Sequence, residues 1–213
     1  PEGGVMCPMA MTYSVVPSLR MAPAVAKEWM PRVLSTEYDR RDIPAHEKTG
    51  AMIGMFMTEK QGGSDIRSNS TIAKPIGSRG IGKDYLLTGH KFFCSAPMCD
   101  AFLVLANTEG MGISCFLVPR WCPDGTRNNL FIEGIKDKLG NRSNASTEME
   151  FQETYGIMLG DEGRGIRTII EMVNGNRLYC AMSSVGIMRQ ALVQALHHPS
   201  HRSVFQKRLI QQP

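Results

Sequence analysis

The chain has 213 residues, 42% of them hydrophobic, and a formal net charge of +4. This length allows one or two domains with a substantial core, and so small a charge does not by itself favour a nucleic-acid partner. No apolar run reaches the length of a membrane span, and the first ten residues lack the basic and then apolar order of a secretory signal. The sequence starts without Met and stops at Gln-Gln-Pro, so we expect it to be truncated at both ends relative to a longer protein.

Cysteine and histidine usage indicates no metal site. The six cysteines are scattered, with no C-x-x-C pair and no metal-ligand spacing, and the C-terminal histidines have no carboxylate or cysteine that completes a ligand set. Reduced and mostly buried thiols favour a reducing compartment, and hence a cytoplasmic location. The residues concerned are Cys7, Cys94, Cys99, Cys115, Cys122, Cys180, His197, His198 and His201.

The N-terminal part of the chain is predicted to be helical. Apolar residues recur at helical spacing over residues 8–34, with interruptions at Pro17, Pro23 and Pro31, so we expect two or three short helices. Residues 35–49 are charged and are predicted to form a surface connection.

Between residues 51 and 159 the sequence consists of short runs rich in β-branched and aromatic residues, which are separated by Gly, Pro and Asn. Such runs are typical of an antiparallel β domain. The predicted strands are residues 52–58, 70–75, 85–93, 101–107, 113–119, 130–135 and 147–152.

Helical periodicity returns after Gly160, where apolar residues recur every three or four positions up to Leu196. One long helix, or two joined near residues 174–176, would give this pattern, and a further helix is expected to start near Ser200. The order of helices, strands and helices predicts an α+β fold.

The stretch MIGMFMTEKQGGSDIRSNS, residues 52–70, indicates a strand that ends in a polar loop. Gly62 and Gly63 allow the tight turn, whose backbone N–H groups could face a phosphate together with the hydroxyl of Ser64. Taken alone, this pattern fits an ordinary hairpin turn equally well, since Gly-rich fragments occur in many unrelated loops.

Three stretches in order, MTEKQGGSD, TGHKFFCSAP and KDKLGNRSNASTEMEF, resemble the acyl-CoA dehydrogenase superfamily, and most closely its alkylation-response branch of the AidB type. The resemblance covers nearly the whole chain. It implies the end of an N-terminal helical domain (residues 1–49), a central antiparallel β-barrel domain (residues 50–159) and the start of a C-terminal helical domain (residues 160–213).

The resemblance implies that FAD is the cofactor. By position in the motifs, Met57 and Thr58 correspond to the donors for the isoalloxazine ring, and Gly63 and Ser64 to the turn that holds the pyrophosphate. The alternative for Thr58 is a strand-terminal Thr whose hydroxyl bonds its own backbone.

The second motif places an aromatic ring and a hydroxyl two residues apart, at Phe93 and Ser95. Residues two apart in an extended segment share a face, so both could meet one flavin ring. The family more often has Trp and Thr there. Because neighbours on a strand point to opposite faces, we expect Phe92 or Phe93 to be core, and we place Phe93 at the cofactor.

Arg202 and Phe205 resemble the family's Arg-x-x-Phe-Gly, in which the Arg reaches the flavin's phosphate or adenine portion across a subunit interface. This resemblance implies a homodimer or homotetramer, and a forked, always charged donor suits such a contact. Gln206 stands where the family has this Gly.

The implied reaction is the α,β-desaturation of acyl-CoA thioesters, which needs a carboxylate to remove a proton. In the family this base lies either late in the C-terminal domain or directly before an Arg of its first long helix. The second place corresponds to Asn176, which cannot act as a base, and the first lies beyond Pro213. Glu59 is expected to be structural. We therefore expect residues 1–213 alone to be inactive.

Two other functions remain open from the sequence. The AidB-type branch includes DNA binders, so the complete protein could be a flavin-containing DNA-associated protein, although Lys and Arg are dispersed here rather than gathered on one stripe. The chain could also be a flavin-free interaction module that keeps only the fold.

Overall fold

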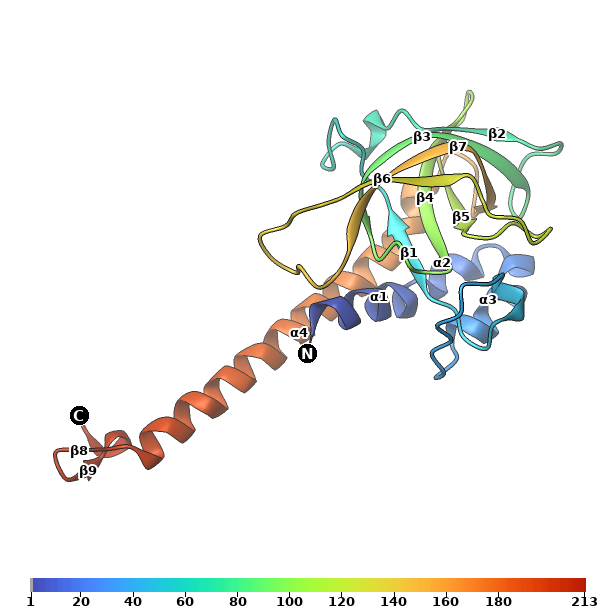
Figure 1. Cartoon of the computed structure of the whole chain (residues 1–213). Helices are drawn as coiled ribbons and strands as arrows, with labels where there is room; N and C mark the ends of the chain where they lie inside the picture. Colours follow the sequence, from blue (N-terminus) through green and yellow to red (C-terminus); the bar gives the residue numbers. More distant parts are fainter. Residues whose placement is uncertain (1) are drawn as a thin grey trace. The chain divides into compact units, whose positions relative to one another are not determined.

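The structure is a computed structural model that describes residues 2–213 (Figure 1). The chain forms two compact units, residues 2–176 and residues 177–213.

The first unit begins with three helices: α1 (Gly3–Ser14), α2 (Val16–Arg20) and α3 (Pro23–Val33). Pro17 and Pro23 stand in the first two positions of α2 and α3, where the missing N–H breaks no helical hydrogen bond. The expected interruption at Pro31 is wrong, because this residue lies within the last turns of α3. Residues 35–49 form the expected connection, with one 3₁₀ turn at Ala45–Glu47.

The central part of the unit is one seven-stranded sheet, in which each predicted strand is present. The strands are β1 (Ile53–Phe56), β2 (Ile72–Pro75), β3 (Asp84–Ser95), β4 (Ala101–Thr108), β5 (Gly112–Pro119), β6 (Leu130–Ile135) and β7 (Ser146–Leu159).

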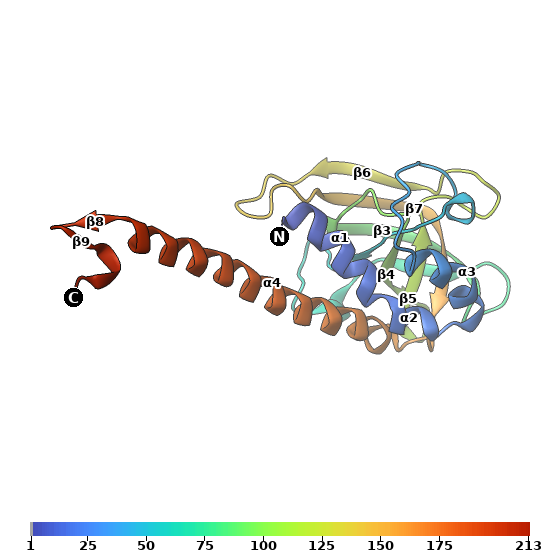
Figure 2. The same ribbon diagram turned by 90° about the horizontal axis from the view of Figure 1, so that it is seen from below.

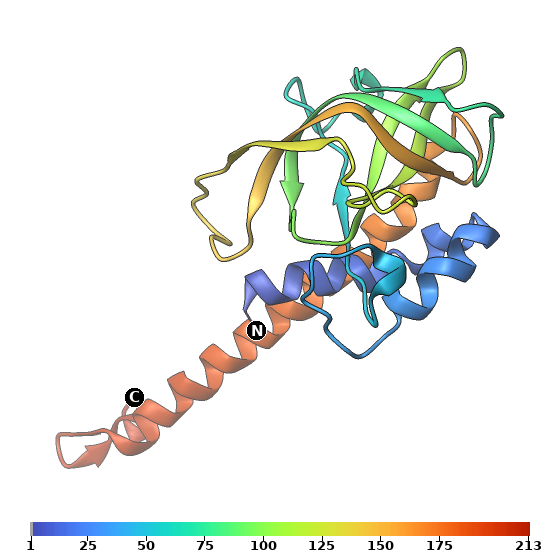
Figure 3. The same ribbon diagram turned by 45° about the vertical axis from the view of Figure 1, so that its right-hand side comes forward.

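The sheet has the order β1-β3-β2-β4-β5-β7-β6, with additional pairings of β1 with β4 and of β3 with β7. The sequence predicted a wholly antiparallel sheet. This prediction is wrong, because β1 and β2 both pair parallel to β4. The expected barrel is likewise not confirmed as such. What the pairings define is a circuit from β3 through β7, β5 and β4 back to β3 by way of the short strands β1 and β2 (Figure 3).

The core lies between the sheet and the three helices. Residues 101–106 of β4 are fully buried, as their uninterrupted apolar run requires of a strand that is covered on both faces. The rings of Phe56 and Phe102 stack with centroids 4.1 Å apart, and Leu19 and Trp29 pack into the same core from α2 and α3. Figures 1 and 2 show the helices on one side of the sheet.

The cysteines differ in exposure, and Cys7 and Cys122 are half-buried. Cys94, Cys99 and Cys115 are buried in this core, and burial raises the pKa of each thiol well above its usual range. Cys180, in the second unit, is exposed.

Helix α4 (Gly165–His201) is a single unbroken helix, so the break considered near residues 174–176 does not occur. Its first three turns belong to the first unit, where Met172 is buried and Ser18 Oγ donates to the carbonyl of Thr168 at 2.7 Å. Gly175 lies so close to α1 that a Cβ there would stand 2.6 Å from Ser14 Oγ. Packing against α1 thus requires glycine at this position.

The second unit holds the rest of α4 and a short hairpin of β8 (Ser203–Val204) and β9 (Lys207–Arg208), followed by a 3₁₀ turn (Leu209–Gln211). The helix expected near Ser200 is therefore wrong. Large apolar side chains of α4 in this unit are exposed: Leu178, Met182, Val185, Ile187, Met188, Leu192, Val193 and Leu196. Over residues 2–213, no helix combines the length and the apolar character needed to cross a membrane.

Candidate functional site

A pocket of about 540 Å³ lies in the first unit, where α1, the end of β1, the turn after β1 and the end of β3 come together. This volume is within the range of small-molecule sites. Its lining residues are Cys7, Met11, Met55, Met57, Thr58, Glu59, Lys60, Gly62, Gly63, Phe92, Phe93, Ser95 and Asn176. They include five of the predicted cofactor residues: Met57, Thr58, Gly63, Phe93 and Ser95.

A β-bulge places both phenylalanines of β3 at the pocket. Between Lys91 and Cys94 the strand β3 advances by three residues while its partner β7 advances by two, from Met149 to Thr147. The alternation of faces is broken there. Both phenylalanines line the pocket and neither is buried, so the expectation that one of them is core is wrong.

The end of β1 presents unused hydrogen-bond donors. The carbonyls of Met57 and Thr58 are occupied, by Asn69 Nδ2 and by the N–H of Phe92, each at 2.9 Å. By contrast, the two N–H groups of Met57 and Thr58 and the Thr58 hydroxyl donate to no residue from 2 to 213. The hydroxyl of Thr58 does not bond its own backbone, which removes the alternative reading of this residue.

The Gly-rich turn after β1 fits the predicted need for small residues. Gly62 has φ of 155°, and its N–H donates to the carbonyl of Glu59 at 3.1 Å. A Cβ at Gly63 would approach Thr58 Cγ2 to 3.0 Å, so a side chain there would crowd the donors of β1. Ser64 is exposed and does not line the pocket, so its contact with a phosphate stays a prediction.

Glu59 is buried and saturated with donors. Its carboxylate accepts from Lys91 Nζ at 2.7 Å and from a group of neighbouring donors. Burial alone would raise the pKa of Glu59, but these hydrogen bonds, the one from Lys91 first, hold it well below the usual range. Glu59 is therefore an ionised structural group and not a proton acceptor for a substrate. The other donors are Gln61 Nε2, Ser70 N and Oγ, and Thr71 N and Oγ1.

Five further residues, Cys7, Met11, Met55, Lys60 and Asn176, line the pocket without having been predicted as cofactor contacts. Cys7 and Met11 stand one turn apart on α1, a spacing that places them on one helix face and could have identified them in the sequence. Lys60 follows Glu59. Asn176, at the position where the family resemblance allows a catalytic carboxylate, lines the pocket, and its Nδ2 donates to the carbonyl of Met172 at 3.2 Å.

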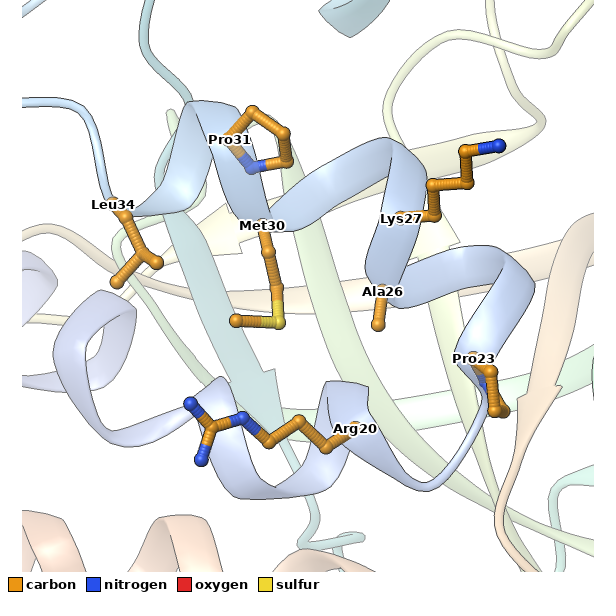
Figure 4. A pocket seen from close by; sticks show the side chains of 7 residues that line it. All are labelled: Arg20, Pro23, Ala26, Lys27, Met30, Pro31 and Leu34. Atoms are coloured by element: carbon orange, nitrogen blue, oxygen red, sulfur yellow. The ribbon is translucent and has the colours of Figure 1, made fainter.

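Two other hollows of the first unit contain none of the predicted site residues. A shallow one of about 550 Å³ lies on α2 and α3, where the Arg20 side chain runs beside Met30 (Figure 4). None of the predicted site residues lines it. A larger cavity of about 680 Å³ is lined by other residues of α1 and by residues 32–39, and it too contains none of them.

The remaining predicted contacts lie in the second unit. Arg202 is exposed, and Phe205 is 89% exposed at the tip of the β8–β9 hairpin. Phe205 and Gln206 both have positive φ, 52° and 62°, so the turn forms without the family's Gly. Their contact with a cofactor stays a prediction. Among residues 2–213 no group of His, Cys, Asp and Glu is arranged to hold a metal ion.

Comparisons with known proteins agree with this fold. Residues 54–154 match the acyl-CoA dehydrogenase middle domain, residues 163–213 the acyl-CoA dehydrogenase C-terminal domain, and residues 1–40 the N-terminal domain of the adaptive response protein AidB. The chain therefore belongs to the acyl-CoA dehydrogenase family. The predicted resemblance is confirmed, including its AidB-type branch.

The relatives are longer than this chain, which spans about a third of their length. AidB of Escherichia coli (strain K12) is 50% identical over all of this chain, which spans 38% of its length. Acyl-CoA dehydrogenase family member 11 of Caenorhabditis elegans is 33% identical over 95% of this chain, which spans 33% of that protein. The crystal structure of Caenorhabditis elegans ACDH-11 in complex with C11-CoA superposes with a TM-score of 0.84 at 29% identity, over 98% of this chain and 36% of that one.

Proposed function

We propose that the pocket between α1 and the ends of β1 and β3 holds the isoalloxazine ring of FAD, and that the protein containing this chain desaturates acyl-CoA thioesters. The observation that carries the proposal is the set of open donors at Met57 and Thr58 beside the rings of Phe92 and Phe93. A flavin ring needs fixed donors at its polar edge and an apolar wall against its face.

The residues of the chain divide this task among them. Met57 and Thr58 supply N–H and hydroxyl donors, and they need no rearrangement to do so because their carbonyls are already fixed. The two phenylalanines and the methionines of α1 and β1 exclude water from the ring. When bound, FAD supplies the acceptor for the hydride that desaturation removes from the acyl chain.

The pocket offers no free carboxylate to act as the base of this reaction. Glu59 is committed to its donors, and Asn176 is an amide. We infer that the α-proton is taken by a group outside residues 1–213, as the family resemblance implies, and that the chain by itself leaves acyl-CoA unchanged.

FAD binding by the purified chain tests the proposal. We expect the protein to bind FAD, with a change in the visible absorbance of the flavin, and Thr58→Val to weaken binding about tenfold through loss of one hydrogen bond. Thr88→Val, an exposed position of β3 outside the pocket, is the matched control and should bind as wild type does. Failure of the wild-type chain to bind FAD would overturn the proposed function.

A gain of function tests the assignment of the base. Asn176→Glu places a carboxylate at the pocket and should allow an acyl-CoA to reduce the bound FAD, which the wild-type chain should not support. Asn174→Glu adds the same charge at an exposed position of α4 and should not do so. Turnover by the wild-type chain would show that the base lies among these 213 residues after all.

Assembly is a separate part of the proposal. The resemblance at Arg202 supports a homodimer or homotetramer for the longer protein, with this residue at the cofactor of a neighbouring subunit. Sedimentation of the longer, FAD-loaded protein as a monomer would exclude this role. DNA binding has no support from the comparisons, and it forms no part of the proposal.

A further inference from the structure

Two hydrogen bonds connect Lys138 through Ser146 to Ser95, which lines the pocket. Lys138 Nζ donates to Ser146 Oγ at 2.9 Å, and Ser146 Oγ lies 3.3 Å from Ser95 Oγ. Ser95 and Ser146 stand directly opposite each other at the ends of β3 and β7, so the sheet register fixes the second contact. Lys138 lies in the connection between β6 and β7, and it also donates to the carbonyl of Asn144.

The chemistry of these groups sets the direction of the hydrogen bonds. An ammonium group only donates, so Ser146 Oγ accepts from Lys138. Ser146 is fully buried, and the Ser95 oxygen is the acceptor within reach of its hydroxyl hydrogen among residues 2–213. Buried hydroxyls rarely leave that hydrogen unbonded, so Ser146 donates to Ser95.

These hydrogen bonds determine the orientation of the Ser95 hydroxyl. Its oxygen accepts from Ser146, and its own hydrogen, which donates to no residue from 2 to 213, must turn away from Ser146. Ser95 lines the pocket, so this hydrogen is available to the pocket's ligand. The charge of Lys138 at the far end polarises both hydroxyls in the same sense and strengthens the donor.

We propose that Lys138 and Ser146 are positioning residues that hold the Ser95 hydroxyl as a hydrogen-bond donor to an acceptor atom of the bound ring. This inference rests on the proposed FAD site and deepens it, because it assigns a fixed polarity to one position of the pocket. Neither Lys138 nor Ser146 lines the pocket, and both act through Ser95.

The experiment compares FAD binding and the visible absorption band of bound FAD in a set of variants. Ser146→Ala removes the partner of the Ser95 hydroxyl, and Lys138→Met removes the donor that fixes which of the two hydroxyls donates. Each variant should therefore weaken binding about five- to tenfold and shift the band. Ser146→Thr keeps the hydroxyl and should restore both readouts. Ser95→Ala combined with Ser146→Ala should match Ser95→Ala alone, since Ser146 acts only through Ser95.

A second hydroxyl pair provides the control. Thr108 Oγ1 and Ser114 Oγ lie 3.0 Å apart on β4 and β5, and both residues are buried but do not line the pocket. Ser114→Ala should therefore lower stability while leaving FAD affinity and the absorption band unchanged. Additive losses in the double variant, or wild-type affinity and spectrum for Ser146→Ala, would contradict the proposed roles of Lys138 and Ser146. Absence of FAD binding by the wild-type chain would instead overturn the proposed function on which these roles depend.

Discussion

Lys91 Nζ lies 2.7 Å from Glu59 Oε1, and both side chains are buried. Glu59 opens the turn that follows β1, and Lys91 directly precedes the bulge of β3. The ion pair thus joins the two walls of the pocket. A second buried pair in the same unit, Lys48 with Asp100 at 2.6 Å, lies outside the pocket and provides a natural comparison.

Breaking the pair at the pocket should cost both stability and FAD binding. In Glu59→Gln, an amide N–H faces the donors that bind the Glu59 carboxylate in the wild-type protein. In Lys91→Met, the Glu59 carboxylate stays buried without its charge partner. Each should lower the free energy of unfolding by about 3–5 kcal/mol, measured by urea denaturation. Asp100→Asn should be costly as well, yet keep FAD affinity near wild type. Equal loss of FAD affinity in all three variants would show that Glu59 and Lys91 have no special relation to the pocket.

The two buried carboxylates should respond to pH in opposite directions. The pKa of Glu59 is held below its usual range by Lys91 and Thr71 despite burial, so its contribution to stability is present above the ordinary value and is lost as pH falls below it. Burial raises the pKa of Asp100, more than the hydrogen bond from Lys48 lowers it, so its contribution is present at low pH and lost as pH rises.

The measurement is the free energy of unfolding between about pH 3 and pH 6, where unperturbed carboxylates titrate. The difference in the free energy of unfolding between wild type and Glu59→Gln should shrink as the pH falls. The corresponding difference between wild type and Asp100→Asn should shrink as the pH rises. Parallel pH profiles for the two variants would contradict the assigned shifts.

Both phenylalanines of the bulge should matter for FAD. Phe92→Ala and Phe93→Ala each remove an apolar ring from the pocket wall, and we expect about tenfold weaker FAD binding in each case. Phe93 is 43% exposed, so its loss should change stability by under about 1 kcal/mol. Phe131→Ala on β6, at 44% exposure, is the matched control. If only one of the two bulge variants loses affinity, the bulge does not bring both rings to the ligand.

Two glycines of α4 should respond in opposite ways to alanine. Gly175→Ala would place its Cβ 2.6 Å from Ser14 Oγ on α1, so the helices must separate, at a cost of about 1–3 kcal/mol. At Gly186 a Cβ would meet open space, and alanine there should stabilise the helix by about 1 kcal/mol through its better helix propensity. Helical circular dichroism during thermal unfolding measures both. A stabilised Gly175→Ala variant would rule out close packing of α1 on α4.

The sequence predicted the elements of the first unit better than their connections. The strands were recognisable because residues 101–106 and their neighbours form short apolar runs between turn residues, a signal that depends on local composition alone. The parallel pairing of β1 with β4 carries no such local signal. The β8–β9 hairpin was missed because its turn uses Phe205 and Gln206, which are not residues that normally mark a turn with positive φ.

Within the site, the sequence identified residues but not their relations. Thr58, Phe93 and Ser95 were found from motif position, and the structure brings them to one pocket. The place of Phe92 was missed because a bulge depends on the register of two strands that are far apart in the chain. For the same reason, the partners of Glu59, above all Lys91, could not be derived from spacing.

The contrast in exposure among the cysteines makes the protein suitable for selective chemical labelling. Thiol reagents attack the thiolate, and Cys94, Cys99 and Cys115 are both inaccessible and held in the thiol form by burial. Cys180 stands exposed on α4, so a maleimide dye should attach there well before it reaches the core. With the half-buried Cys7 and Cys122 replaced by Ser, a fluorophore at that position would report on the second unit without labelling the pocket.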